Sequence, residues 1–218
     1  MRIIAGEARG RTIEAPRGRN TRPTLDRVRE NLFNMLQGYT EDSRVLDLFA
    51  GSGALSLESL SRGAVYAVMV DHDRSACEIQ RKNIISLGFT DRVKQLRSDW
   101  QKATEELRAE GQTFDLIFLD PPYGMAGTRE VFEALKPLTS PESLIVLEHQ
   151  SGVAPEVPEE YSIMKQRNWG YCGVSIYRLN AEEPAKTDIA DNTVAAERTA
   201  VTYSTGHTDN TENIEYHR

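Results

Sequence analysis

The sequence predicts an α/β fold whose central sheet has seven strands, most of them parallel. From Arg44 onward, short apolar runs alternate with segments in which apolar residues recur at helical spacing, which is the pattern of βαβ units. The first run leads into a glycine turn that opens a helix. We expect strands at residues 44–48, 65–71, 93–97, 114–119, 143–148, 161–167 and 172–179, and helices at 53–62, 73–87, 100–109 and 128–136 on both faces of the sheet.

The last two expected strands differ from the others because no helix separates them. Only four residues lie between the two runs, namely Asn168, Trp169, Gly170 and Tyr171. A parallel pair needs a long crossover connection, whereas a short connection joins antiparallel strands. We therefore expect an antiparallel hairpin at the sheet edge.

Residues 1–40 predict a small extension ahead of the sheet domain at 41–180. The segments 2–4 and 11–14 are typical of a short β-hairpin around two glycines, and 17–23 of a polar loop. Thr24 can cap a helix that ends near Gly38. The apolar residues of this helix that share one face are Leu25, Val28, Leu32 and Leu36.

Charge is distributed unevenly along the chain, whose formal net charge is −7. Residues 1–40 carry eight Arg, no Lys and four acidic residues, a net charge of +4. The Arg fork binds phosphate oxygens or guanine edges in a bidentate manner, although an ordinary solvated surface is the alternative. The segment 181–218 is polar, has a net charge of −5 and lacks apolar periodicity, so we expect a disordered acidic tail.

Composition limits the class of protein. No apolar stretch approaches the roughly 18 residues needed to span a bilayer, and the apolar start of the chain is too short for a secretory signal. A cytoplasmic location is therefore expected. Two cysteines, Cys77 and Cys172, make no disulfide framework, and the four histidines lack metal-ligand spacing. We expect free thiols and no bound metal.

The glycine turn at residues 51–53 predicts a nucleotide-like ligand. Gly51 and Gly53 let the backbone turn tightly and approach a ligand, and the following helix offers free N–H groups. Asp71 ends the next strand, 18 residues after Gly53, where an acid grips ribose hydroxyls in dinucleotide folds. However, the turn lacks the third glycine of the dinucleotide motif, and Asp47 precedes it, where a pyrophosphate would be repelled.

A cationic ligand fits Asp47 better than a pyrophosphate does. S-adenosylmethionine carries a sulfonium and an α-ammonium group, and Asp99 could accept a hydrogen bond from its adenine amino group. Asp47, Asp71, Asp99 and Asp120 all lie at the expected carboxyl ends of strands, where open α/β sheets bind ligands. Helix capping is the alternative role for such aspartates.

The tetrapeptide Asp120-Pro121-Pro122-Tyr123 follows a buried run and makes a plausible clamp for a flat amine. Proline has a fixed φ and no N–H, so the two prolines form a stiff shelf. Asp120 and the Pro121 carbonyl can accept the two N–H groups of an exocyclic amine, while Tyr123 stacks on its ring. The alternative is a turn that only ends the strand.

These motifs resemble those of class I S-adenosylmethionine-dependent amino-methyltransferases, which have a Rossmann-like fold. The residues that show this resemblance are Asp47-x-Phe49-x-Gly51-x-Gly53 and Asp120-Pro121-Pro122-Tyr123. Within residues 1–33, Arg2-Ile3-Ile4-Ala5-Gly6 with Gly10-Arg11, Thr21-Arg22-Pro23-Thr24 and Arg27-Val28-Arg29-Glu30-Asn31-Leu32-Phe33 are similar to a narrower group. That group is the bacterial 16S ribosomal RNA guanine-N2 methyltransferases of the RsmD family, and the resemblance covers residues 1–180.

The resemblance implies a substrate and a set of residue roles. The substrate would be a guanine N2 in 16S ribosomal RNA, free or in an assembling small subunit, and the enzyme would act as a monomer. Asp120, Pro121, Pro122 and Tyr123 would be catalytic; Asp47, Phe49, Ala50, Gly51, Gly53, Asp71, His72, Ser98 and Asp99 would bind the cofactor; Arg9, Arg11, Arg22, Arg27 and Arg29 would bind RNA. Arg22 and Arg29 could instead pair with Glu30 and Asp26. Whether Asp120 accepts a proton or only orients N2 stays open.

Three other functions remain compatible with parts of the sequence. The same tetrapeptide serves adenine-N6 methylation in DNA or other RNA. An NAD-type oxidoreductase shares the glycine turn but is disfavoured by Asp47. A noncatalytic RNA-binding factor could keep the fold, although every expected site position is filled.

Overall fold

The computed structural model describes residues 1–15, 23–122, 125, 127–153 and 155–180. Its elements are α1 (Pro23–Met35), β1 (Arg44–Asp47), α2 (Ala54–Ser61), β2 (Tyr66–Asp71), α3 (Arg74–Leu87), β3 (Val93–Arg97), α4 (Trp100–Ala109), β4 (Phe114–Leu119), α5 (Thr128–Leu135), β5 (Thr139–Gln150), β6 (Tyr161–Trp169) and β7 (Cys172–Leu179). Short 3-10 turns, Thr90–Arg92 and Lys136–Leu138, precede β3 and β5. The expected acidic tail lies outside the described residues.

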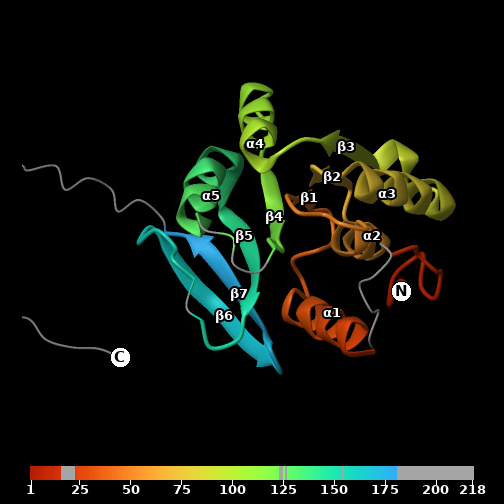
Figure 1. Ribbon diagram of the computed structural model, residues 1–218, viewed down its shortest axis with the longest axis horizontal. Helices are drawn as coiled ribbons and strands as arrows, with labels where there is room; N and C mark the ends of the chain where they lie inside the picture. Colours follow the sequence, from red (N-terminus) through yellow and green to blue (C-terminus); the bar gives the residue numbers. More distant parts are fainter. Residues whose placement is uncertain (16–22, 123–124, 126, 154, 181–218) are drawn as a thin grey trace, which may run out of the picture. The chain divides into compact units, whose positions relative to one another are not determined.

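The strands form one seven-stranded sheet in the order β3-β2-β1-β4-β5-β7-β6 (Figure 1). Strands β1 to β5 pair in parallel, whereas β7 pairs antiparallel with both β5 and β6. The predicted α/β class and the edge hairpin are therefore confirmed. None of the helices in the described ranges is long and apolar enough to cross a membrane.

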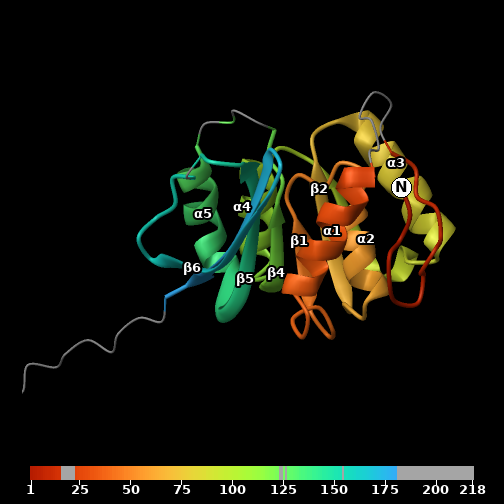
Figure 2. The ribbon, with the colours of Figure 1, turned by 90° about the horizontal axis from the view of Figure 1, so that it is seen from below.

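Helices cover both faces of the sheet, and each face has its own apolar core (Figure 2). Side chains of a strand alternate between faces, so Val45 joins the core beneath α1, α2 and α3, while Leu46 joins the core beneath α4 and α5. On the second face, Phe132 packs edge-to-face on Tyr161 and Tyr177, with ring centroids 5.0 and 5.2 Å apart. We call these the α1 face and the α4 face.

The N-terminal segment packs on the α1 face. Its expected hairpin reduces to a single antiparallel bridge between Arg2 and Thr12, and Ile3 and Ile13 are buried in the core of that face. The buried carboxylate of Glu58 in α2 accepts hydrogen bonds from the N–H groups of Ile4 and Ala5, at 2.8 and 3.0 Å. The segment is thus anchored to α2.

Among the boundaries that differ from those expected, two have a clear physical reason. Helix α1 begins at Pro23, so Thr24 lies inside its first turn and does not precede the helix as a cap. Proline suits that first position because its fixed φ is helical and the first N–H has no partner in the helix. Strand β5 begins at Thr139, four residues earlier than expected, through a register shift opposite Phe114 that accommodates Pro141.

Candidate active site

The glycine turn after β1 is held in place by the end of β2. Gly51 and Gly53 have φ values of 54° and 79°, in the left-handed region that favours glycine. The Gly51 N–H donates to Oδ2 of Asp71 at 2.8 Å, and a Cβ on Gly53 would lie 3.0 Å from the Met69 sulfur. The predicted turn and Asp71 are therefore in direct contact.

Asp71 uses both carboxylate oxygens to organise the loops around it. Besides Gly51, it accepts a hydrogen bond from the Asp73 N–H on Oδ1 at 2.9 Å. Each carboxylate oxygen has two acceptor sites, so ribose hydroxyls can still be accepted. The adjacent His72 is exposed, with Nδ1 3.8 Å from Asp71 Oδ1. Their predicted cofactor roles stay predictions.

Asp47 is a buried carboxyl with an unmet hydrogen-bonding need. Its side chain is 1% exposed, and Ser56 Oγ donates to Oδ2 at 3.0 Å, whereas no group of the described residues donates a hydrogen bond to Oδ1. Burial, together with the charge of Asp71, raises the pKa of Asp47 to about 7 despite the Ser56 hydrogen bond. Bringing a cation to Oδ1 would stabilise the ionised form.

The loop after β3 shows the capping role that was the alternative for Asp99. Its Oδ1 accepts from the Lys102 N–H at 2.9 Å at the start of α4, and that hydrogen bond lowers the pKa of Asp99. The preceding Ser98 donates its N–H to the Asp71 carbonyl at 3.1 Å. The β3 loop is thus tied to the β2 loop, and an adenine contact by Asp99 stays a prediction.

Asp120 follows β4 on the same face as Asp47. Asp47 lies opposite Phe118 in the parallel pair, and Phe118 belongs to the core of the α1 face. Strand alternation therefore directs Asp120 toward that face as well. Pro121 is half-buried and Pro122 is exposed. The Pro122 carbonyl accepts a hydrogen bond from the Met125 N–H at 3.0 Å. Tyr123 lies outside the described residues.

The sheet register adds Glu148, which sequence analysis missed, to this edge. Leu119 of β4 lies opposite Leu147 of β5, so Asp120 and Glu148 are the next residues on neighbouring strands. The pKa of the nearby Cys172 thiol is raised to about 12, first by burial and then by the Glu148 and Asp120 carboxylates. Carboxylates therefore line the ends of four adjacent strands, in the order Asp71, Asp47, Asp120 and Glu148.

The Arg residues predicted to bind RNA differ in their environments. Arg9 and Arg27 are exposed, and Arg22 lies outside the described residues. Arg11 donates to the carbonyls of Ser86 and Leu87 at the end of α3. Arg29 is only 5% exposed and donates to the Arg2 carbonyl at 2.5 Å, so these contacts support the structural alternative for this residue.

The remaining cofactor residues flank the glycine turn. Phe49 is half-buried against the core of the α4 face, and Ala50, 8% exposed, donates its N–H to the Val70 carbonyl at 2.9 Å. Sequence analysis missed Ser56 because it is one of several serines in α2, and nothing in the sequence indicates which of them contacts Asp47.

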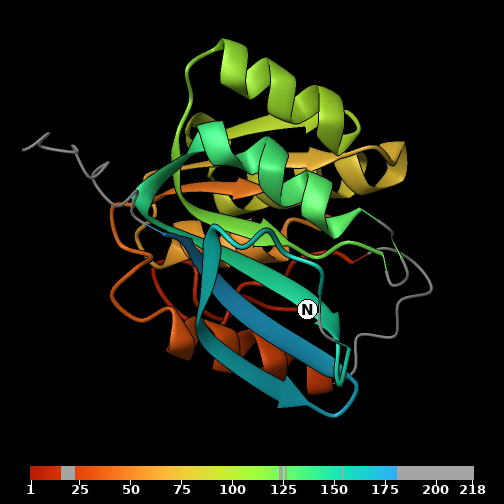
Figure 3. The same cartoon turned by 90° about the vertical axis from the view of Figure 1, so that its left-hand side faces the viewer.

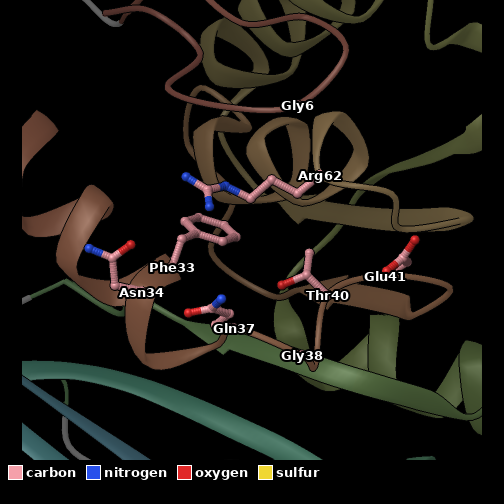
Figure 4. Close-up of a pocket in the computed structure, with 8 residues that line it drawn as sticks. All are labelled: Gly6, Phe33, Asn34, Gln37, Gly38, Thr40, Glu41 and Arg62. Atoms are coloured by element: carbon pink, nitrogen blue, oxygen red, sulfur yellow. The ribbon is translucent and has the colours of Figure 1, made fainter.

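A cavity of about 440 Å³ lies away from this edge (Figure 4). It is lined by Gly6, Phe33, Asn34, Gln37, Gly38, Thr40, Glu41 and Arg62. These residues come from the N-terminal segment, the end of α1 and the loops that lead into β1 and β2, whereas ligands of open α/β sheets bind where strands end. The cavity is therefore separate from the candidate active site.

Comparison with known proteins decides the family. A family model described as "Conserved hypothetical protein 95" matches residues 1–178. The chain belongs to this family. Within it, "Ribosomal RNA small subunit methyltransferase D" of Escherichia coli K12 is 34% identical over 191 residues, covering 86% of this chain and 94% of the relative. The protein of the same name from Haemophilus influenzae is 32% identical over 184 residues, covering 82% and 93%.

A solved structure agrees with the family assignment. The hypothetical protein TTHA0928 of Thermus thermophilus superimposes with a TM-score of 0.69 at 28% identity, over 83% of this chain and 99% of that one. The predicted relation to the RsmD family is therefore confirmed.

Proposed function

We propose that the protein methylates the exocyclic N2 of a guanine in 16S ribosomal RNA, with S-adenosylmethionine as the methyl donor. The names of the family members support a methyltransferase of small-subunit ribosomal RNA. The observation that carries the proposal is the line of carboxylates from Asp71 to Glu148. Within this line lies the buried Asp47, whose Oδ1 has no hydrogen-bond partner among the described residues.

The residues of the glycine turn suit the cofactor. Asp47 Oδ1 would accept from the α-ammonium group, Asp71 from the ribose, and the open space beside the backbone of Gly51 allows close approach. The cofactor supplies an activated methyl group on a sulfonium. The protein supplies alignment and a site in which the positive charge of the cofactor is balanced.

Asp120 and the Pro121 carbonyl would hold the acceptor amine. Both would accept N–H groups of N2 and orient its lone pair toward the methyl group. As the new C–N bond forms, N2 becomes acidic, and the adjacent carboxylate of Asp120 stabilises the charge or accepts the proton. The guanine must leave its stack to reach this site.

Glu148 favours guanine over the adenine alternative. Beside N2, guanine presents N1–H, a donor that a second carboxylate can accept. Beside N6, adenine presents N1 with a lone pair, which a carboxylate repels. Because Glu148 lies next to Asp120 on the same face, we assign it to N1–H of the target base.

The activity is tested with small-subunit particles from cells that lack the modification. We expect a labelled methyl group on a guanine of 16S RNA, and Asp120→Asn should bind S-adenosylmethionine normally yet lower the transfer rate at least about 100-fold. Absence of transfer to these particles by the wild type would contradict the proposal and leave adenine-N6 methylation of another nucleic acid or a noncatalytic RNA-binding factor as the function.

Base choice is tested by placing 2-aminopurine, which keeps N2 but lacks N1–H, at the target position. Loss of a hydrogen bond to a charged group should lower kcat/KM of the wild type about 10- to 100-fold. Glu148→Gln can donate to N1 of 2-aminopurine and should bring the two substrates within about threefold. Glu142→Gln, at an exposed position of the same strand, is the control and should discriminate like the wild type. Equal discrimination by Glu148→Gln would contradict the assignment.

A further inference from the structure

The β6–β7 hairpin is positively charged in an acidic protein. Residues 161–180 contain Lys165, Arg167 and Arg178 and no acidic residue, whereas the whole chain has a net charge of −7. The hairpin also forms the edge of the sheet, because β6 is the last strand in the sheet order. The sign of the charge on this edge is therefore opposite to that of the chain as a whole.

The cations of β6 point to the α1 face. Lys165 lies opposite Ile176 and Arg167 opposite Val174, and both partners belong to the core of that face. Directly opposed residues of a strand pair share a face. Figure 3 shows the hairpin beside α1, and Lys165 Nζ donates to the Met35 carbonyl of α1 at 2.8 Å. Both side chains are nevertheless exposed.

No acidic side chain among the described residues neutralises these two charges. Neither Lys165 nor Arg167 has an acidic partner anywhere in the described ranges, and their hydrogen bonds go to neutral carbonyls. Many other cations in those ranges are paired: Arg62 with Glu58, Arg74 with Glu78, Lys82 with Glu14, Arg92 with Glu7, Lys94 with Glu106 and Glu110, Lys102 with Asp99, Arg129 with Glu133 and Lys136 with Glu160. The hairpin charges are left for a partner.

The hairpin leads directly to the candidate active site. Arg167 lies opposite Val174, Val174 opposite Glu148, and Glu148 neighbours Asp120. Three strand spacings of about 4.8 Å place Arg167 about 14 Å from Asp120 along this row. At the tip, Tyr171 is 56% exposed, and its carbonyl accepts from the Ser151 N–H at 2.8 Å.

We propose that β6 is the surface on which the RNA backbone docks, with Lys165 and Arg167 on phosphates and Tyr171 available to stack on an unpaired base. The proposal rests on the proposed function for the kind of substrate. Phosphates complement unpaired cations, and aromatic side chains near such cations suit unstacked bases. The RNA would cross the hairpin and deliver one base to Asp120. This surface is distinct from the N-terminal Arg cluster, in which Arg29 is buried.

A protein component of the ribosomal particle is the competing occupant. Ile163 and Met164 of β6 are 54% and 44% exposed, and an edge strand can pair with another chain. Binding to naked 16S RNA separates the two partners, because only RNA docking needs the cations when no protein is present.

The test compares Lys165→Glu/Arg167→Glu with Arg81→Glu/Arg108→Glu, which changes the net charge equally at exposed positions of α3 and α4. Affinity for naked 16S RNA should fall about tenfold or more in the hairpin variant only, and the salt slope should decrease by about 1.5. The value of KM for the RNA substrate should rise with it, whereas kcat should stay within about twofold of wild type.

A milder variant, Lys165→Gln/Arg167→Gln, guards against misfolding and should show a smaller effect in the same direction. Unchanged affinity for naked RNA would overturn the proposal, and a loss confined to ribosomal particles would assign the edge to a protein. If the wild type binds RNA through β6 but transfers no methyl group, the proposed function fails and the docking surface stands.

Discussion

Replacing Asp47 by Asn should remove a pH dependence of the free energy of unfolding of the cofactor-free protein. The rise in the pKa of Asp47 from 3.8 to about 7 corresponds to roughly 4 kcal/mol in favour of the protonated form. Between these two values the folded protein holds a proton that the unfolded chain has released. Stability of the cofactor-free protein is therefore lost as pH rises from about 4 to about 7.

Urea unfolding at about pH 5 and about pH 8 measures this effect. As pH rises from about 5 to about 8, ionisation of Asp47 should lower the free energy of unfolding by roughly 3 kcal/mol. In Asp47→Asn this contribution should be absent. Asn keeps an acceptor for Ser56, so the comparison isolates the charge. Asp91→Asn, which removes an exposed carboxylate, should behave as the wild type does.

The same carboxyl should release a proton when the cofactor binds. At about pH 5.5 most Asp47 is protonated, and a cation at Oδ1 favours ionisation, so binding should release close to one proton. Calorimetry in buffers of different ionisation enthalpy counts that proton, and Asp47→Asn should bind more weakly and release none. Equal pH dependence of stability in wild type and variant, or binding without proton release, would refute the reasoning.

Three further pairs of substitutions test the parts around the site, mainly by urea unfolding. Glu58→Ala should cost about 3–5 kcal/mol, because it removes the buried carboxylate that pairs with partly buried N–H donors of the N-terminal segment and with a guanidinium, and Glu58→Gln should cost less. Gly6→Ala should cost more than about 4 kcal/mol, since its Cβ would lie 1.6 Å from the Ser61 carbonyl oxygen. Gly10→Ala is the control: Gly10 has the same φ of 82° but open space around the Cβ position, so this substitution should cost only about 1–2 kcal/mol. Asp99→Ala should lower the free energy of unfolding because the cap of α4 is lost, whereas Asp99→Asn should keep the cap. Weaker cofactor binding by the Asn variant would therefore indicate an adenine contact.

The fold could be predicted because its elements have strong local signals. Buried parallel strands appear as continuous apolar runs, as in Phe114–Leu119, and the start of α4 is marked by Asp99 at its cap. The early start of β5 escaped prediction because the segment from Ser140 to Ser143 contains Pro141 and Glu142, which are typical of a turn. Its pairing depends on a register shift against β4, which is a tertiary property.

The candidate site was predicted only where its residues belong to a local motif. Gly51, Gly53 and Asp71 stand in one βαβ pattern, and the structure joins Gly51 to Asp71 directly. Glu148 was missed because its nearness to Asp120 follows from the pairing of β4 with β5. Arg29 lies in an Arg-rich stretch, yet the packing of α1 buries it. Composition alone could not distinguish an Arg that faces solvent from one, such as Arg29, that is buried and donates to a backbone carbonyl.

The N-terminal segment and the glycine turn are held by the same two helices. In α2, Ser56 donates to Asp47, while Glu58, two residues later, accepts the backbone of the segment. In α3, Asn83 donates Nδ2 to the Ser52 carbonyl of the turn and to the carbonyl at the end of the segment, each at 3.0 Å. Without the segment, Glu58 of α2 and Asn83 of α3 would lose these hydrogen-bond partners, and both side chains lie close to the residues that hold the turn. The segment therefore supports the geometry of the turn, whatever its exposed Arg residues contact.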